Sequence, residues 1–467
     1  MNTAAYAFAG LFLAFLATMH LLQLVPHLLA LRALRRSVSV RSLQELPPAF
    51  SGFEPPVSLV VAAFDQEATI ADTVRALLQL DYADFEIVVV NDGSNDATLA
   101  ALEFAFDLEA FPKVYWRRLA TRTVRAIYKS HAEPRLLVVD KEHGGRADAL
   151  NAGINASHYP LFCAVDPQQM LHRDSLRRAL EPFVDDPATV AVGAAIRPAN
   201  GCAVAENRVT AVELPQSLLG MLQIAEYLRT YPFARLGWAE MKASLVMSGA
   251  VAVFRKDAVV ESGGFKSDTG GAATELMMRL HRVMRTRKED YSVHFVADAV
   301  SWNIVPETFG ALREQHVRRQ LRLAESLHAN ASLLGSRGTV GMLAFPGLML
   351  FECYGPLLEL AGYAAMLALF ALGWLPGKAL ALVLVASFGL GFLVSASALL
   401  LEEYSFRLYP RAGQLARLLL ASAVENLGYR QLVACWRTMG LWQWMRARLK
   451  QRAPPRRELP SHGRLRP

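Results

Sequence analysis

An apolar run near the N-terminus, residues 4–31, constrains this chain more than any other feature. About 20 consecutive apolar residues are enough to cross the hydrocarbon core of a bilayer, so the run predicts a transmembrane helix within residues 1–38. Four arginines follow within residues 32–41, and the positive-inside rule therefore places the residues after the helix in the cytoplasm. No charged region precedes the run and no small-residue cleavage site follows it, so we expect a retained helix and not a removable signal peptide. A proline-containing linker, residues 39–56, comes next.

A second apolar region lies near the C-terminus, and we assign residues 331–440 to it. Two spans are predicted there, at 342–372 and 379–401. Three charged residues interrupt the next apolar segment, 412–436: Arg417, Glu425 and Arg430. Charged groups are costly inside a bilayer, so this segment predicts an interfacial or bundle-buried helix in preference to a further span.

The net charge of +7, from 49 Lys and Arg against 42 Asp and Glu, is concentrated at one end of the chain. Eight basic residues and one acidic residue follow position 445, so the remainder is balanced. This distribution excludes an evenly basic, nucleic-acid-binding domain. It predicts a basic disordered tail, residues 441–467, that contacts anionic membrane lipids. The four cysteines have no CxxC spacing, so neither a zinc site nor a disulfide framework is indicated.

Between the apolar regions, residues 57–330 have the pattern of an α/β domain. An apolar strand at 57–64 is followed by a helical pattern at 69–80 and a second strand at 86–90, an order that implies a parallel sheet. Further strands are expected at 135–139, 161–165, 190–195 and 293–297. The class is therefore a Rossmann-like fold, with ligands expected at the carboxyl ends of the strands.

Two motifs follow predicted strands. Residues 91–94 read Asn-Asp-Gly-Ser, and Asp92 could accept hydrogen bonds from a nucleotide, although this sequence is also a common turn. Residues 140–151 contain Gly144 and Gly145 ahead of a predicted helix, with cations nearby. A helix N-terminus of this kind can hold a phosphate, and its position after a strand strengthens a signal that a glycine pair alone gives only weakly.

Taken together, the motifs at 88–94, 140–153 and 163–166 (Cys-Ala-Val-Asp) resemble those of family 2 inverting glycosyltransferases. The likeness is to the membrane-bound branch that includes the cellulose, hyaluronan and poly-N-acetylglucosamine synthases, and it covers roughly residues 55–440. The order and number of these motifs make the resemblance specific.

The resemblance implies a GT-A fold that uses a nucleotide-activated sugar, usually a UDP-sugar, with a divalent metal, Mg²⁺ or Mn²⁺. It implies a lipid or polysaccharide acceptor, possible partner subunits, and a bacterial-type inner membrane with the catalytic domain and the C-terminus in the cytoplasm. Asp166 would be the first acid of the metal-binding DxD motif. The residues that would lie at the nucleotide are Glu67, Asp92, Lys141, Arg146 and Asp166.

The sequence departs from the family pattern at the metal-binding motif and at the position of the catalytic base. The DxD motif reads Asp166-Pro167-Gln168, so one carboxylate is an amide and we expect weakened metal binding. The catalytic Asp position falls on Ala273; an alternative register places Leu276 there, and neither residue is a base. Glu275 is a weak substitute, because two residues along a helix rotate a side chain by about 200° from residue 273.

The third departure is at the acceptor. The family motif Gln-x-x-Arg-Trp is matched by Gln315 and Arg318, but Arg319 stands where the resemblance implies a tryptophan that stacks on the acceptor sugar. The same stretch also has the pattern of a basic helix on an anionic membrane surface, and the two interpretations are compatible.

Polar residues within the predicted spans form two faces. His20, Gln23 and His27 share one helical face, and Glu352 and Glu359 share another. Such residues generally face a bundle interior or a water-filled path. The two faces either line a route for a polymer or lipid acceptor, or form interhelical hydrogen bonds alone.

The sequence thus predicts a membrane glycosyltransferase that retains part of its nucleotide-sugar pocket and is impaired by the loss of its base. The alternative function is that of a catalytically degenerate partner or scaffold in the assembly of an envelope polysaccharide.

Overall fold

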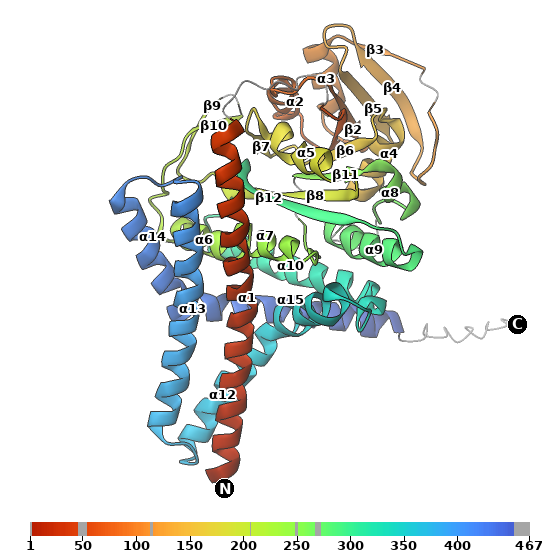
Figure 1. Cartoon of the computed structure of the whole chain (residues 1–467). Coiled ribbons are helices and arrows are strands. Elements are labelled where there is room, and N and C mark those ends of the chain that lie inside the picture. Colours follow the sequence, from red (N-terminus) through yellow and green to blue (C-terminus); the bar gives the residue numbers. More distant parts are fainter. Residues whose placement is uncertain are drawn as a thin grey trace, which may run out of the picture.

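The computed structural model describes residues 2–44, 54–112, 115–205, 207–247, 251–266 and 272–452. An α/β body lies at one end of the molecule and a column of long helices at the other (Figure 1). Helix α1 (Asn2–Gln44) extends along both parts, and α12 (Gly355–Ala371) and α13 (Gly377–Ser405) lie beside it in the column.

A mixed sheet forms the centre of the body. Within the described residues it has ten strands, in the order β3-β4-β5-β2-β1-β6-β11-β8-β12-β7. Neighbouring strands among β5, β2, β1 and β6 pair in parallel. The strands of the sheet are β1 Val57–Ala63, β2 Phe85–Asn91, β3 Leu108–Ala110, β4 Val124–Ser130, β5 Leu136–Lys141, β6 Leu161–Val165, β7 Met170–Leu171, β8 Thr189–Pro198, β11 Val251–Arg255 and β12 Ser292–Asn303. A separate hairpin consists of β9 Ala203–Ala205 and β10 Arg208–Ala211.

Strand β1 shows why an apolar run forms the centre of this sheet. Leu59 and Val61 belong to one buried cluster, whereas Val60, on the opposite face, packs with Ile154 in another. A strand buried on both faces is expected to be apolar almost throughout, as β1 is. The two clusters hold the strand ends in fixed positions, and those ends carry the motifs.

Each predicted strand of the body falls on a strand of the structure, and the parallel pairing expected from the strand-helix-strand order is confirmed for β1 and β2. The sheet also contains antiparallel pairs, which the sequence pattern did not indicate. Strand β11 pairs antiparallel with both β6 and β8, and β4 pairs antiparallel with β5. Only five residues, 131–135, separate β4 from β5. A parallel crossover needs about a dozen residues or more, so this connection permits only an antiparallel pair.

Helices cover both faces of the sheet, and α7, α10 and α15 lie between it and the helical column (Figure 1). The helices of the body are α2 Ile70–Leu78, α3 Thr98–Phe106, α4 Arg146–Ala156, α5 Ser175–Asp185, α6 Leu218–Thr230, α7 Pro232–Glu240, α8 Lys256–Glu261, α9 Ala272–Arg287, α10 Phe309–Ala329 and the short η1 Ala331–Leu333.

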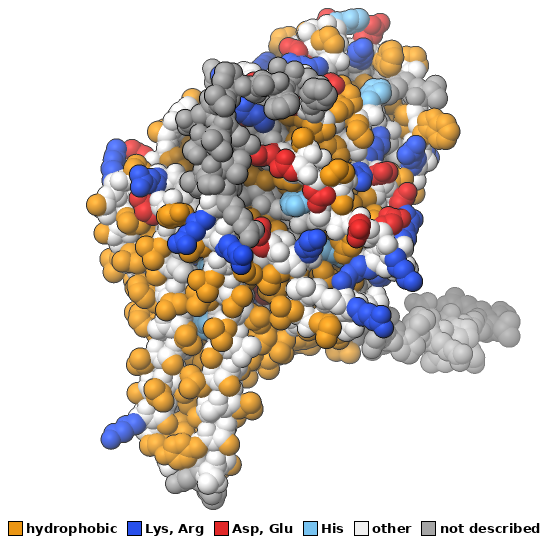
Figure 2. Space-filling model, viewed as in Figure 1, with side chains coloured by type: hydrophobic (Ala, Val, Ile, Leu, Met, Phe, Trp, Pro, Cys, Tyr) orange, Lys and Arg blue, Asp and Glu red, His pale blue; other side chains and the backbone are white. Residues whose placement is uncertain are grey.

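Two helical stretches among the described residues, Thr3–Arg35 and Gly377–Ser405, are long and apolar enough to cross a membrane. A third candidate is a bent pair, Val340–Cys353 with Gly355–Ala371, whose halves meet at 51°. Pro356 begins the second half, where it removes a backbone donor and favours the break. The pair comprises η2 Val340–Ala344, α11 Phe345–Gly347, η3 Leu348–Cys353 and α12. Hydrophobic side chains cover most of the column surface in Figure 2, as expected of a membrane protein.

The C-terminal helices are α14 Ala412–Val424, η4 Glu425–Tyr429 and α15 Arg430–Arg452. The predicted disordered tail from residue 441 therefore begins as helix. Leu441 and Trp444 pack in a buried cluster, and the guanidinium of Arg446 lies 3.4 Å from the ring centre of Trp442, so this stretch gains contacts that its charge pattern alone does not indicate. The predicted linker from residue 39 is likewise helical as far as Gln44, and the remainder of both segments, 45–53 and 453–467, lies outside the described residues.

Candidate functional site

Asp92 follows strand β2, and its carboxylate is bound by the protein itself. It accepts hydrogen bonds from the backbone nitrogens of Gly144 at 3.0 Å and Gly145 at 2.7 Å, and from Lys141 Nζ at 2.6 Å. The side chains of Asp92 and Lys141 are buried, and Lys141 also pairs with Asp148 at 2.6 Å. These two residues therefore fix the loop that precedes α4.

The turn after Asp92 lies directly against that loop. Gly93 has a φ of +66°, and a Cβ there would lie 2.6 Å from the backbone nitrogen of His143. Only glycine fits this approach without displacing backbone. Glu67 is exposed beside the same region, where its Oε2 accepts a hydrogen bond from the Ala97 backbone at 2.9 Å.

Arg146 and Asp166 form the rim of a cavity of about 850 Å³ under the sheet. Arg146 begins α4 and Asp166 follows β6, and their side chains are joined at 2.6 Å. Both are partly exposed to the cavity. Asp166 and Arg146 thus face a space that a ligand can enter, whereas Glu67, Asp92 and Lys141 do not line it.

One carboxylate of this rim could hold a cation. Asp166 offers one carboxylate, which Arg146 already contacts, and among the described residues no three His, Cys, Asp or Glu side chains gather as a metal cluster. Mg²⁺ commonly binds through one or two carboxylates with the phosphates of its substrate. The residues present therefore fit a cation held chiefly by a diphosphate, with Asp166 as its protein ligand.

The predicted base position, Ala273, lies in the first turn of α9 and lines the same cavity with Thr274. Glu275 is buried elsewhere, and its carboxylate pairs with Arg279 at 2.8 Å. Arg279 also donates hydrogen bonds to the carbonyls of Ser262 and Gly264. Glu275 therefore fastens a loop to α9 and does not line the cavity. The glycines that precede Ala272 lie outside the described residues.

Helix α10 forms another wall of the cavity with Gln315, Arg318 and Arg319. Arg318 is paired with Glu314 on the same helix. The lining contains more cations than anions among the described residues, namely Arg146, Arg235, Arg318, Arg319, Arg322 and Arg437 with Asp166, Glu314 and Glu352. Such a wall favours an anionic ligand. Arg235 and Arg437 belong to no motif, so sequence reasoning did not find them.

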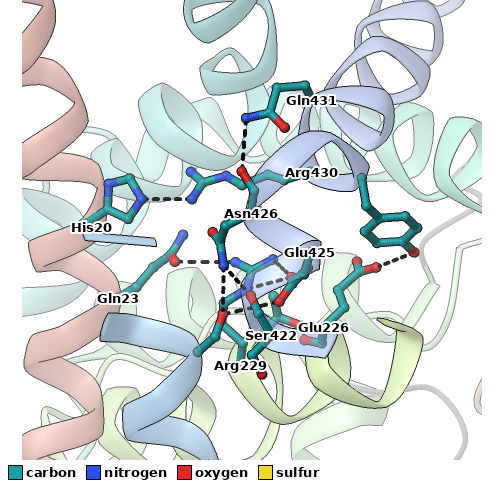
Figure 3. Close-up of polar contacts among 12 residues, drawn as sticks. His20, Gln23, Glu226, Arg229, Ser422, Glu425, Asn426, Arg430 and Gln431 are labelled. Carbon is teal, nitrogen blue, oxygen red and sulfur yellow. Dashed lines mark hydrogen bonds and ion pairs between the residues drawn. The ribbon is translucent and has the colours of Figure 1, made fainter. Parts of the chain in front are cut away.

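The two polar faces predicted within the spans meet at Arg430 of α15, whose contact with His20 is drawn in Figure 3. Arg430 lies 2.7 Å from His20 of α1 and 3.6 Å from Glu359 of α12. Gln23 accepts a hydrogen bond from Arg229 at 3.4 Å, and Arg229 pairs with Glu425 at 2.7 Å. These helices are therefore joined by hydrogen bonds and ion pairs, which accounts for Glu425 and Arg430 in segment 412–436.

Residues 55–321 match the model of a family described as glycosyltransferase like family 2. The chain belongs to this family. The match contains the loop at Gly144 and Gly145, the rim at Asp166 and the wall at Gln315, and it confirms the resemblance drawn from the motifs.

Two curated relatives of this family 2 glycosyltransferase are poly-beta-1,6-N-acetyl-D-glucosamine synthases. The protein from Staphylococcus aureus (strain COL) is 27% identical over 263 residues, and that from Staphylococcus epidermidis is 26% identical over 263 residues. Each alignment covers 56% of this chain and 53% of the relative. The chain therefore spans about half the length of the curated relatives it matches.

Solved structures with a similar course of the chain include two transferases. One is a mannosyltransferase from Pyrobaculum calidifontis in complex with GDP-Man and Mn²⁺, with a TM-score of 0.48 and 19% identity over 89% of this chain and 99% of that chain. The other is glucosyl-3-phosphoglycerate synthase from Mycobacterium tuberculosis in complex with Mn²⁺, uridine diphosphate and glucosyl-3-phosphoglycerate, with a TM-score of 0.36 and 14% identity over 60% and 82%.

Proposed function

We propose that this family 2 glycosyltransferase binds a UDP-sugar in the cavity under the sheet and transfers the sugar to a lipid or polysaccharide acceptor. The observation that carries the proposal is that one cavity collects Arg146 and Asp166 from the strand side, Ala273 from α9, and Gln315 and Arg318 from α10. These are the positions at which family motifs supply donor, base and acceptor groups. Relatives named as poly-beta-1,6-N-acetyl-D-glucosamine synthases support a glycan product.

Each group has a defined part in such a transfer. The guanidinium groups of Arg146 and Arg318 bind and neutralise the leaving diphosphate, because paired N–H donors match phosphate oxygens. Asp92 acts from outside the cavity by holding Gly144 and Gly145 in place at the start of α4. Asp166 would hold a divalent cation, which when bound supplies further neutralisation of the diphosphate.

The transfer lacks a general base for a hydroxyl acceptor. Ala273 offers no proton acceptor, and the carboxylate of Glu275 is occupied by Arg279. General-base catalysis typically contributes about 10²- to 10⁴-fold, so we expect transfer to a sugar hydroxyl to be slowed by a factor of this size.

Nucleotide binding tests the first half of the proposal. UDP binding to the purified full chain is measured by calorimetry with Mg²⁺ or Mn²⁺, for the wild type, Arg146→Gln and Gln168→Asp. We expect wild-type binding, a loss of about tenfold or more in Arg146→Gln, and tighter metal-dependent binding in Gln168→Asp. Arg313→Gln, on the exposed side of α10, is the control. Absence of UDP binding at millimolar concentration would contradict the proposal.

The second candidate function is that of a partner or scaffold that binds nucleotide without turnover. This function is favoured because Glu275 is ion-paired with Arg279 and because Ala273 occupies the position of the base. The two functions differ in transfer by the wild-type chain: the scaffold function requires that UDP binds while transfer to every acceptor stays at the uncatalysed rate.

We propose a bacterial-type inner membrane location with the body and the C-terminal helix on the cytoplasmic side. Support comes from Arg32 and Arg35, which end the apolar part of α1, and from the course of α1, which extends from the column to the body (Figure 1). A protease added to right-side-out spheroplasts should leave the body intact and should cut it only after lysis. Cleavage of the body in intact spheroplasts would contradict this orientation.

A further inference from the structure

The cavity of the candidate site continues toward the membrane helices. A second cavity, which reaches α1 at Met19 and Leu22, shares lining residues with the first. The shared residues include Arg235, Arg319, Leu348, Glu352 and Arg437. The two cavities therefore meet at a junction between α7, α10, η3 and α15.

Most cations of the second cavity already have partners (Figure 3). Arg229 pairs with Glu425 at 2.7 Å and Arg430 contacts Glu359 at 3.6 Å. Arg437 donates to Gln320 at 2.8 Å and lies 3.7 Å from Glu352. These charges are balanced within the protein.

Two arginines at the junction differ from these. Arg235 is only 6% exposed, and its Nε has no hydrogen-bond partner. Neither Arg235 nor Arg319 forms an ion pair with any described residue. Burial lowers the pKa of Arg235, the charge of Glu352 opposes this shift, and the charge of Arg319 adds to it. Burying a charge without a partner is costly. An anion placed between the two guanidinium groups would supply that partner.

Arg319 also occupies the position at which the family motif has the acceptor-stacking tryptophan. Replacing a flat ring by a guanidinium removes a platform for a neutral sugar and creates a donor group suited to phosphate. The arginine at position 319 therefore suits an anionic acceptor better than a neutral sugar.

The lining of the second cavity also includes apolar residues of the membrane helices, beside Gln23, Glu352 and Glu359 of the same helices. Met19 and Leu22 come from α1, and Leu348, Phe351 and Pro356 come from the bent helix pair. Both elements are candidate membrane spans. The junction thus places two arginines without ion pairs next to apolar side chains of the membrane helices.

We propose that the acceptor is a lipid phosphate, with its phosphate between Arg235 and Arg319 and its chain along α1 and the bent pair. This inference rests on the proposed function. A phosphate monoester is already anionic at neutral pH. Its oxygen forms the new bond to the anomeric carbon while the bond from that carbon to the β-phosphate oxygen of UDP breaks, and UDP leaves with the electron pair. No proton is removed, so the step needs no base at Ala273.

Binding of dodecyl phosphate to the full chain in an uncharged detergent tests this inference. We expect Arg235→Gln and Arg319→Gln each to weaken binding about tenfold or more, since each removes a hydrogen-bonded charge. Arg319→Lys should retain most of the affinity, and Arg313→Gln, on the same helix but outside both cavities, should be unchanged. Dodecyl glucoside, glucose 1-phosphate and inorganic phosphate should each bind at least about tenfold more weakly.

Equal dodecyl phosphate binding in wild type and Arg319→Gln would overturn the inference. If dodecyl glucoside bound as tightly as dodecyl phosphate, the acceptor would be neutral. If inorganic phosphate or glucose 1-phosphate bound as tightly as dodecyl phosphate, the acceptor would be soluble. Either result would also overturn the inference. UDP binding is measured on the same samples. If one of these results is found while UDP still binds, the lipid acceptor is rejected and the proposed function is retained. If UDP binding is absent, the proposed function itself fails.

Discussion

At the scale of single residues, two acids that the motifs place near the site bind other groups of the protein itself. Asp92 binds Lys141 and the backbone of Gly144 and Gly145, and Glu275 binds Arg279. The sequence could predict that these residues lie at strand ends and helix starts, since apolar runs locate those elements. It could not predict their partners, because an ion pair such as Asp92–Lys141, 49 residues apart, depends on the register of β2 and β5.

Glu275→Gln separates a structural role from a catalytic one. The substitution leaves the buried Arg279 without its counter-charge, and we expect a loss of about 3–5 kcal/mol in the free energy of unfolding. Transfer per folded molecule should stay within a few-fold of wild type, because Glu275 does not line the cavity. Denaturant unfolding and a transfer assay on folded protein give the two values. A fall in transfer without a loss of stability would assign Glu275 to the chemistry.

At the scale of elements, α1 and α7 are joined by a close backbone approach. A Cβ on Gly237 would lie 2.0 Å from the carbonyl oxygen of Pro26, so only glycine permits this contact. The apolar run of α1 was predictable from its sequence, but its partner in the body was not, since Gly237 has no motif around it. Strand β4 was missed for a related reason: the exposed Arg125 and Lys129 interrupt its half-buried and buried residues, so no apolar run marks it.

Gly237→Ala tests this junction. We expect a loss of about 1–3 kcal/mol in stability, as for other overpacked contacts, together with separation of α7 from α1. Gly389→Ala in α13 is the matched control, because nothing lies within 4 Å of a Cβ at that position. Thermal unfolding of the two variants in one detergent provides the measurement. Equal melting temperatures would contradict the close approach.

At the scale of the whole molecule, the body was predictable and the way it joins the helical column was not. The positions of the six predicted strands and of the motifs follow from local apolar patterns, whereas the junction of the two cavities combines Arg235, Arg319 and Arg437 from three helices. No local pattern records that these three side chains meet, because their contacts arise only when α7, α10 and α15 pack between sheet and membrane helices (Figure 1).

Global stability should depend on pH through His281, which lies inside the body against Tyr291 and the carbonyl of Ser244. Burial lowers the pKa of His281 from 6.5 to about 4. The unfolded chain therefore binds a proton that the folded chain does not between these values, and stability falls as the pH drops from 6.5 toward 4, by up to about 1.4 kcal/mol per pH unit. Unfolding of His281→Gln between about pH 7.5 and 5 should show a shallower pH dependence than wild type. An identical dependence would exclude His281 as the source.

The most direct measurement of the central claim, a donor site without a base, is sugar transfer from a UDP-sugar to a hydroxyl acceptor by wild type and Ala273→Asp. A carboxylate at position 273 faces the cavity, as Ala273 does, and restores a proton acceptor. We predict that Ala273→Asp transfers the sugar at least about 10²-fold faster than wild type, with UDP affinity unchanged. Metal-dependent transfer by the wild type at a rate equal to that of Ala273→Asp would contradict it.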